Sequence, residues 1–537
     1  MLPEIRDHAR LSATFRWRLP ERFSIAEAIC DRFARREPDR PAILLKRPGV
    51  ALDITTYGEL RRRSLALAAA LAKRGLGRGD RIAVLLPQGP EAIVAHVAAS
   101  RLGAVAMPLA LAFGPDALSY RLADSGTRAI VTTAAGLAKL REIAEPLPAL
   151  ETVVSVDGAD EDALDYAALT ATGEAPPEIA LGPDDPALMI YTSGTTGPPK
   201  GALHGGRVLI GHLPGFRLTH DFLPRPDDRA WTPADWAWAG GLLNLAMPAL
   251  HYGVPLVAQP TTKFEPEAAF ALMDEAKLRN VFVPPTALRL MSAVERPRER
   301  HRFALRSAVS AGEQLGEATF LWAKEALGLT VNEVYGQTEC NYVLSSAAAL
   351  GVSKPGAIGK ATPGAEVALF AADGRRCGPG EPGEIRVRQP HPVTFLKYWG
   401  KPEATTEKFD GEWLLTGDQA VMDEDGYVRF VGREDDVITS SGYRIGPGEI
   451  EDCLSRHPAV ALAAVVGKPD AVRTSIVKAF VQLKPGVEGG PELVDEIKAF
   501  VRTRLSSHEY PREVVFVPEL PLTTTGKVIR RLLRERE

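Results

Sequence analysis

Short apolar runs alternate with stretches of helical period along about the first 430 residues. The run RIAVLL at residues 81–86 predicts a buried strand that ends at a proline. Residues 90–102 predict a helix, because proline stands in the first turn and glycine follows the last residue. The same alternation continues at residues 104–107, 115–124, 129–132, 187–191, 254–258, 265–277, 280–283, 306–310 and 315–327. Strands that alternate with helices of this length predict an α/β protein with helix-covered parallel sheets.

The C-terminal part has a different pattern. A charged, glycine-rich stretch, REDDVITSSGYRIGPGEIE, follows Gly432. We expect helices at residues 450–456 and 492–505, and strands at residues 461–466, 478–483 and 513–517. These elements make an α+β unit with its own small core. We therefore predict two domains, residues 1–432 and residues 433–537, with the boundary near residues 432–436.

The composition narrows the function classes. Apolar residues make up 45% and charged residues 25% of the chain, as in ordinary globular proteins. The net charge of −4 argues against a dedicated nucleic-acid or anionic-membrane partner. The most apolar stretch, residues 241–258, is too interrupted to predict a membrane span. Four cysteines without Cys-x-x-Cys spacing and an N-terminus without an apolar signal segment favour a reducing, cytoplasmic location.

A loop rich in glycine and hydroxyl residues follows the expected strand at residues 187–191. It reads TSGTTGPPKG and spans residues 192–201. Glycines let the backbone approach a phosphate, N–H and hydroxyl groups can donate to its oxygens, and Lys200 adds a positive charge. The Walker A pattern is not satisfied. A generic loop of this composition would be a polar surface loop, but its place after a strand favours a phosphate site.

The string YTSGTTGPPKG resembles the signature of the adenylate-forming superfamily, which contains acyl-CoA synthetases, luciferases and peptide-synthetase adenylation domains. Further motifs of that family follow in the same order, namely SAGE at 310–313, YGQTE at 335–339, TGD at 416–418, GREDDVITSSGYRIGPGEIE from 432 and PLTTTGKVIRR from 521. The resemblance extends from about Phe23 to Arg531. It implies a large N-terminal domain with a small β-barrel-like part, and a small mobile α+β C-terminal domain.

The resemblance also implies a reaction with two halves. A carboxylate attacks the α-phosphate of ATP to give acyl-AMP and pyrophosphate, and the thiol of coenzyme A then displaces AMP. Because the first half brings two anions together, positioning and charge neutralisation supply most of the catalysis. ATP, Mg²⁺ and coenzyme A are the implied cofactors and substrates, together with a small carboxylic acid.

Individual residues take roles from the matching motifs. Lys527 matches the cation between carboxylate and α-phosphate, Thr338 a phosphate contact, and Glu339 the Mg²⁺ ligand. Asp418 matches the acceptor for both ribose hydroxyls. The implied catalytic residues are Lys527, Thr338, Glu339 and Arg433. The implied nucleotide-binding residues are Thr192, Ser193, Gly194, Thr195, Thr196, Gly197, Lys200, Gly312, Glu313, Glu333, Tyr335, Gly336, Thr338, Asp418, Arg433 and Arg444. Asp435 matches the hinge, and Gly442 and Tyr443 match the loop that meets coenzyme A.

The acyl pocket is the least determined part. The segment WTPADWAWAGG at residues 231–241 most resembles the acetyl-CoA synthetase and medium-chain branch. The implied lining residues are Trp236, Trp238, Gly240, Gly241, Ala311 and Gly336. Acetate-specific relatives carry tryptophan at the position of Gly336, so glycine predicts a deeper pocket and a short-to-medium-chain acid longer than acetate. The lack of a basic residue in these segments disfavours a dicarboxylic acid.

Two other functions stay open at this point. One is an adenylating ligase that loads a carrier-protein phosphopantetheine. The other is a non-catalytic nucleotide-binding protein, which the presence of Lys527, Glu339, Asp418 and Arg433 disfavours. The oligomeric state, monomer or homodimer, is equally open.

Overall fold

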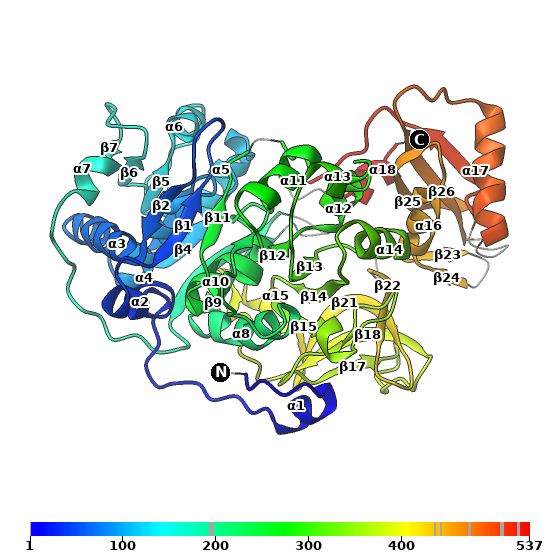
Figure 1. The fold of residues 1–537 in the computed structure, drawn as a ribbon, viewed down its shortest axis with the longest axis horizontal. Helices are drawn as coiled ribbons and strands as arrows, with labels where there is room; N and C mark the ends of the chain where they lie inside the picture. Colours follow the sequence, from blue (N-terminus) through cyan, green and yellow to red (C-terminus); the bar gives the residue numbers. More distant parts are fainter. Residues whose placement is uncertain are drawn as a thin grey trace.

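Four β-sheets organise the part of the chain that the structure, a computed structural model, describes (Figure 1). The described residues are 2–192, 198–261, 263–433, 436–440, 443–470, 474–504, 510–523 and 527–536. Two large, mostly parallel sheets lie in the N-terminal part, an antiparallel sheet follows, and the fourth sheet belongs to the C-terminal segment.

The first large sheet is parallel in its centre and antiparallel at its edges. Its strands, in spatial order, are β16 (Lys360–Ala361), β15 (Cys340–Ser345), β14 (Val331–Gln337), β13 (Ser307–Ala311), β12 (Asn280–Phe282), β10 (Ala230–Trp231), β11 (Leu256–Ala258), β1 (Pro41–Leu45) and β2 (Asp53–Thr56). The carboxyl end of β13 and the hairpin of β14 and β15 are therefore neighbours, which brings two of the predicted motifs together.

The second large sheet carries the glycine- and hydroxyl-rich loop. Its strands, in spatial order, are β19 (Lys397–Tyr398), β9 (Lys200–Gly205), β8 (Pro186–Thr192), β4 (Val105–Pro108), β3 (Arg81–Leu85), β5 (Ala129–Thr132), β6 (Thr152–Ser155) and β7 (Leu164–Asp165). The strands from β8 to β7 are parallel, whereas β9 and β19 continue the sheet in antiparallel fashion.

Helices cover both large sheets, and the largest buried cluster joins them. It contains side chains of α3 (Tyr57–Ala72), α4 (Pro90–Arg101), α8 (Arg207–Thr219) and α10 (Met247–Tyr252). The helices of the N-terminal part are α1 (His8–Thr14), α2 (Arg32–Arg36), α3 (Tyr57–Ala72), α4 (Pro90–Arg101), α5 (Pro115–Ser125), α6 (Ala134–Arg141), α7 (Tyr166–Thr170), α8 (Arg207–Thr219), α9 (Ala239–Gly241), α10 (Met247–Tyr252), α11 (Pro266–Glu275), α12 (Pro285–Met291), α13 (Pro297–Arg300), α14 (Glu317–Ala326) and α15 (Pro402–Thr406). A capping box of Thr56 and Glu59 begins α3, and Gly126, at φ 60°, ends α5. Among the described helices none is long and apolar enough to span a bilayer.

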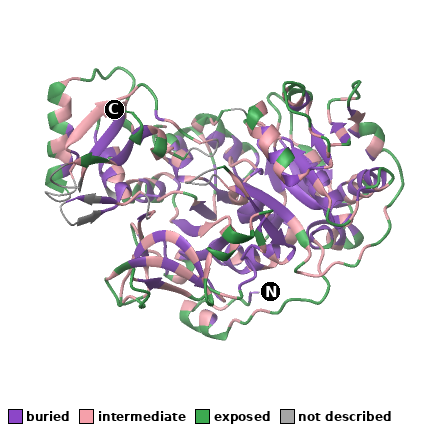
Figure 2. Cartoon of the chain, turned by 180° about the vertical axis from the view of Figure 1, so that it is seen from behind, coloured by how far each residue is buried: buried purple, intermediate pink, exposed green. Residues whose placement is uncertain are grey.

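The third sheet is the expected small barrel-like part and is antiparallel throughout. It contains β17 (Val367–Phe370), β18 (Pro382–Arg388), β21 (Trp413–Met422) and β20 (Phe409–Asp410), with β22 (Val428–Arg433) paired to β21. It buries its own cluster, which includes Ile385, Val387 and Leu414. Figure 2 shows buried stripes on these strands between exposed connecting loops.

The fourth sheet and three helices form the C-terminal part, at the right of Figure 1. Its strands are β24 (Tyr443–Ile445), β23 (Ile438–Ser440), β26 (Thr474–Leu483), β25 (Val460–Asp470) and β27 (Glu513–Phe516), and its helices are α16 (Pro447–Ser455), α17 (Pro491–Arg504) and α18 (Arg530–Arg534). The predicted fold class is confirmed, whereas the exact boundary between two domains stays a prediction. In the arrangement seen here, α16 lies against α14, and Arg456 forms an ion pair of 3.4 Å with Glu317.

Candidate active site

The described ends of the predicted phosphate loop lie on the paired strands β8 and β9. Thr192 ends β8 and pairs with Lys200, which begins β9. Ser193, Gly194, Thr195, Thr196 and Gly197 lie outside the described residues. Next to this pair, a Cβ on Gly201 would lie 2.9 Å from the sulfur of the buried Met189, so a larger residue would displace that side chain. The hairpin thus holds Thr192 and Lys200 next to each other on a rigid sheet.

The YGQTE motif forms the tight connection between β14 and β15. Tyr335, Gly336 and Gln337 end β14, and Thr338 and Glu339 make the turn. A Cβ on Gly336 would lie 2.5 Å from the backbone nitrogen of Tyr342, on the paired strand β15. Gly336 is therefore also required by the close approach of two backbones, a reason that is independent of any pocket.

Glu339 is a buried carboxylate with a defined partner. The hydroxyl group of Tyr398, on β19, donates a hydrogen bond to its Oε1. The backbone nitrogen of Phe395 donates to the Glu339 carbonyl oxygen at 2.9 Å. Burial and the negative charge of Glu339 raise the pKa of Tyr398, so its hydroxyl remains a donor at neutral pH. The Tyr398 contact was not predicted, since Tyr398 lies outside the recognised motifs.

Asp418 lies at the centre of a hydrogen-bond network on β21. Its Oδ2 accepts from the hydroxyl of Tyr335 at 2.6 Å and from Nε2 of Gln337 at 2.7 Å. On the paired strand β22, Nη1 of Arg433 lies 3.7 Å from Oδ1. Burial raises the pKa of Asp418, and the charge of Arg433 opposes that shift. The network connects the YGQTE and TGD motifs, a contact that the motifs alone did not predict.

The SAGE motif follows β13, which ends at Ala311. Gly312 adopts φ 101°, a conformation that favours glycine. The carboxylate of Glu313 accepts from Oγ1 of Thr286 at 2.8 Å and forms an ion pair with Arg289, both on α12. This ion pair holds the Glu313 carboxylate in place at the edge of the site.

Glu333 on β14 is a buried carboxyl group. Its Oε2 accepts from the backbone nitrogen of Leu315 at 3.3 Å. Burial raises its pKa to about 7, and the negative charge of Asp452, on α16, adds to the rise. A carboxyl group of the N-terminal part therefore responds to a charge of the C-terminal part.

Lys527 reaches this set of residues from the C-terminal part. Its backbone nitrogen donates to Oγ1 of Thr523 at 3.0 Å, which closes the loop that carries it. Its Cε would lie 3.6 Å from a Cβ placed on Gly312, an ordinary van der Waals contact, so the lysine side chain lies beside this glycine. The Lys527 residue is exposed, and the negative charges of Glu313 and Asp418 favour its ammonium form. The cluster thus combines residues that are more than two hundred positions apart in the sequence.

The segment predicted to line the acyl pocket precedes and forms α9. Trp236 is buried, and the ring of Trp238 meets that of Phe113 edge-on, with centroids 5.8 Å apart. A Cβ on Gly240 would touch the ring of Phe282 at 3.4 Å, and one on Gly241 would lie 2.5 Å from a carbonyl oxygen. Gly241 therefore serves close packing against the backbone, and Phe113 is an unpredicted neighbour of Trp238.

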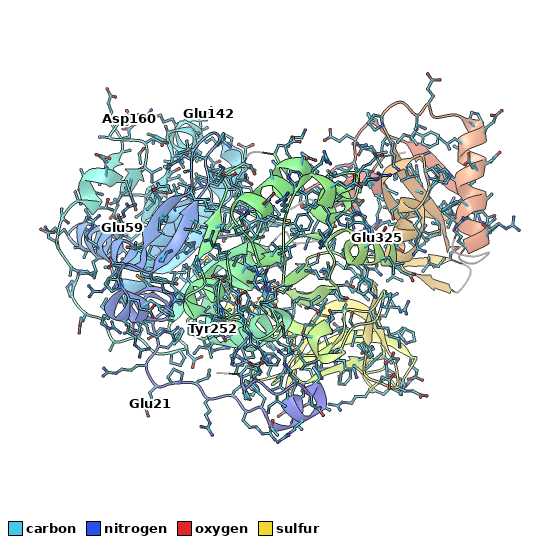
Figure 3. The ribbon with its side chains drawn as sticks, viewed as in Figure 1. Glu21, Glu59, Glu142, Asp160, Tyr252 and Glu325 are labelled. Carbon is cyan, nitrogen blue, oxygen red and sulfur yellow. The ribbon has the colours of Figure 1, made fainter. Side chains whose placement is uncertain are left out.

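The predicted hinge and coenzyme A residues are only partly described. Arg433 ends β22, and Tyr443 and Arg444 belong to β24. Asp435 and Gly442 fall outside the described part of the chain. No group of three or more metal-binding side chains occurs among the described residues. Glu339 is the single residue that the sequence predicted as a metal ligand. Figure 3 shows α14, with Glu325, at the side of the N-terminal part that faces the C-terminal sheet.

Comparison with known proteins decides the family. The model of the AMP-binding enzymes matches residues 30–399, and the model of the AMP-binding enzyme C-terminal domain matches residues 449–527. The chain belongs to the AMP-binding enzyme family. The predicted membership in the acyl-CoA synthetase branch of the adenylate-forming superfamily is confirmed, and this AMP-binding protein is an enzyme.

Relatives match over nearly the whole chain. The enzyme is 33% identical to the uncharacterized acyl-CoA ligase YtcI of Bacillus subtilis, over 90% of each chain. It is 33% identical to the human mitochondrial acyl-coenzyme A synthetase ACSM4, over 97% of this chain and 91% of the relative. Among solved structures, the anthranilate CoA ligase AuaEII in complex with anthranoyl-AMP is 28% identical, with a TM-score of 0.87 over 96% of this chain and 98% of that chain.

Proposed function

We propose that this AMP-binding enzyme is an acyl-CoA synthetase for short-to-medium-chain carboxylic acids longer than acetate. It would form an acyl-AMP from the acid and ATP, and then transfer the acyl group to the thiol of coenzyme A. The observation that carries the proposal is the position of Lys527 beside Gly312, within electrostatic reach of Glu313, Asp418 and Arg433. A positively charged side chain of the C-terminal part thereby lies close to the residues of the N-terminal part that are predicted to bind the nucleotide.

In the first half-reaction, a carboxylate oxygen bonds to the α-phosphorus of ATP while the bond from phosphorus to pyrophosphate breaks. The Lys527 ammonium would offset the repulsion between these two anions. Asp418 would orient the ribose through its hydroxyl groups, and Thr338 and the β8–β9 hairpin would hold phosphate oxygens. Glu339 offers a buried carboxylate of the kind that Mg²⁺ prefers, and a bound Mg²⁺ would supply charge neutralisation at the phosphates.

In the second half-reaction, the thiol sulfur bonds to the acyl carbon and AMP leaves. We assign the hinge to Asp435, and the coenzyme A contact to Gly442 and Tyr443, from their family motif. Arg444 would then meet the nucleotide from β24. These assignments depend on a rotation of the C-terminal part about residue 435, which would withdraw Lys527 and bring β24 to the site.

The proposed acyl pocket combines Trp236, Trp238, Gly240, Gly241, Ala311 and Gly336. Trp238 and Phe113 form an aromatic wall. Gly336 adds no side chain of its own, so the pocket keeps its depth. The similar AuaEII is named for an aromatic acid, which makes aromatic acids a necessary comparison in any substrate survey.

Acid-dependent exchange between ATP and pyrophosphate tests the proposal. The panel runs from acetate to dodecanoate and includes branched and aromatic acids. We expect the highest kcat/KM for an acid longer than acetate, and thioester formation with coenzyme A. Preference for acetate would contradict the pocket assignment. Thioester formation with a phosphopantetheinylated carrier protein, but not with coenzyme A, would favour the carrier-loading alternative.

A further inference from the structure

A tyrosine outside the recognised motifs connects two parts of the candidate site. Tyr398 lies on the edge strand β19 and pairs with Ala202 of β9, the second strand of the phosphate hairpin. Its hydroxyl group donates to Oε1 of Glu339 in the β14–β15 turn. The Nζ atom of Lys200 lies 5.2 Å from the centre of the Tyr398 ring. One side chain therefore contacts both the phosphate hairpin and the proposed metal ligand.

The surroundings hold Tyr398 in a single orientation. The side chain is buried, as is that of Glu339, with relative exposures of 4% and 7%. The Tyr398 backbone nitrogen donates to Oγ1 of Thr405 at 3.0 Å, and the Phe395 ring packs against the tyrosine ring at 4.8 Å between centroids. The Phe395 backbone nitrogen also binds the Glu339 carbonyl oxygen. The segment from Phe395 to Tyr398 thus contacts Glu339 through both its backbone and its side chain.

The direction of the hydrogen bond decides its chemical effect. Tyr398 is the donor and takes one lone pair of Oε1 of Glu339, which fixes the plane of the carboxylate and so the direction in which its remaining lone pairs, above all those of Oε2, would meet a cation. A phenol group that donates a hydrogen bond to a carboxylate fixes the rotamer of that carboxylate. Residues that hydrogen-bond to metal ligands, without binding the metal themselves, orient those ligands in the same way. The Lys200 ammonium lies over the face of the same ring, so the tyrosine that orients Glu339 also contacts the phosphate hairpin.

We propose that Tyr398 is a positioning residue that orients the Glu339 carboxylate toward the divalent cation of the bound nucleotide and couples this orientation to Lys200. The inference rests on the proposed role of Glu339 as the metal ligand. Loss of an outer partner of a metal ligand commonly weakens metal binding by about 10- to 100-fold. Acyl transfer from a supplied acyl-AMP requires no pyrophosphate chemistry, so Tyr398 should matter for the first half-reaction alone.

The experiment measures Mn²⁺ affinity in the complex of the full chain with ATP, in the absence of any acid. In Tyr398→Phe, the Kd for Mn²⁺ should rise by about 10- to 100-fold, while ATP binding in the presence of a chelator stays unchanged. The apparent Mg²⁺ requirement of ATP–pyrophosphate exchange should rise in parallel, and thioester formation from supplied acyl-AMP should persist. Tyr57→Phe is the matched control, because buried Tyr57 donates a hydrogen bond of 2.7 Å to Leu250, away from the site.

The outcomes separate this inference from the proposed function. If Glu339→Gln weakens Mn²⁺ binding but Tyr398→Phe does not, the role of Tyr398 is refuted and the role of Glu339 stands. If Glu339→Gln keeps full Mn²⁺ affinity, both fail. Equal losses in both half-reactions of Tyr398→Phe would show a merely structural role and overturn the inference.

A second variant keeps the test decisive if Tyr398→Phe does not fold. Thr405→Val removes the acceptor of the Tyr398 backbone N–H and leaves the hydroxyl group intact. It should weaken Mn²⁺ binding in the same direction. Unchanged Mn²⁺ affinity in a folded Thr405→Val protein that has lost the hydrogen bond between Tyr398 and Glu339 would overturn the proposal.

Discussion

Removal of the Lys527 ammonium group tests the proposed function most directly. In Lys527→Ala, the rate of acyl-AMP formation should fall by about three orders of magnitude, whereas thioester formation from supplied acyl-AMP should continue. The size follows from electrostatics: two unit charges about 4 Å apart interact by about 4 kcal/mol at an effective dielectric constant of 20. Each 1.36 kcal/mol changes a rate about tenfold. The lysine side chain already lies beside Gly312 and within electrostatic reach of Glu313.

Single-turnover measurements of the two half-reactions provide the assay. Acyl-AMP formation is followed with enzyme in excess over ATP, and thioester formation is followed with synthetic acyl-AMP and coenzyme A. Lys468→Ala is a suitable control, since Lys468 belongs to the same part of the chain but forms its ion pair with Glu513 at 2.7 Å. Equal losses in both half-reactions of Lys527→Ala, or a similar loss in Lys468→Ala, would refute the reasoning.

Three further predictions concern protons and packing. Because Lys527 must carry a positive charge to act, acyl-AMP formation should decline at alkaline pH as the lysine loses its proton, and Lys527→Arg should move that decline to higher pH in a pH–rate profile. An unmoved decline would assign it to another group. Burial raises the pKa of Glu333 from 4.5 to about 7, so the folded state loses stability as pH rises between these values. Glu333→Gln should therefore be more stable than the wild type at pH 8, by about 3 kcal/mol at most, and equally stable at pH 4. Denaturant titrations at the two pH values measure the difference. Gly336→Trp should abolish activity with longer acids, and it should lower the free energy of unfolding by about 1–3 kcal/mol because its Cβ would meet the β15 backbone; an unchanged acid profile would contradict the pocket role.

The elements that were predicted well from the sequence are those whose two ends are marked by proline or glycine. The strand expected at residues 81–86 is β3 (Arg81–Leu85), and the helix expected at residues 90–102 is α4 (Pro90–Arg101). Proline and glycine punctuate both elements, so the prediction needed no tertiary information. The motifs likewise indicated that Asp418 and Tyr335 belong to one site, and their hydrogen bond is present.

Contacts between distant segments could not be predicted. Tyr398 and Glu339 are 59 residues apart, and no local pattern distinguishes Tyr398 from any other tyrosine in an apolar run. From the sequence, Gly336 indicated a pocket for a larger substrate. The structure adds a second reason for glycine at this position, since the backbone of β15 passes too close to leave room for a side chain. Such reasons depend on strand pairing, which the sequence determines only through the whole fold.

The alternation of side chains along β14 has a consequence for how this enzyme can change. Glu333, Tyr335 and Gln337 are spaced two residues apart, and the last two both bind Asp418. The pairing with β15 is irregular between Tyr335 and Gln337, but a residue inserted or deleted between Glu333 and Tyr335 would turn the side chains on one side of the change to the opposite face. Substitutions can therefore vary the chemistry of this face one position at a time, but its length is fixed, and loop grafts between relatives should begin only after Ser345, where β15 ends.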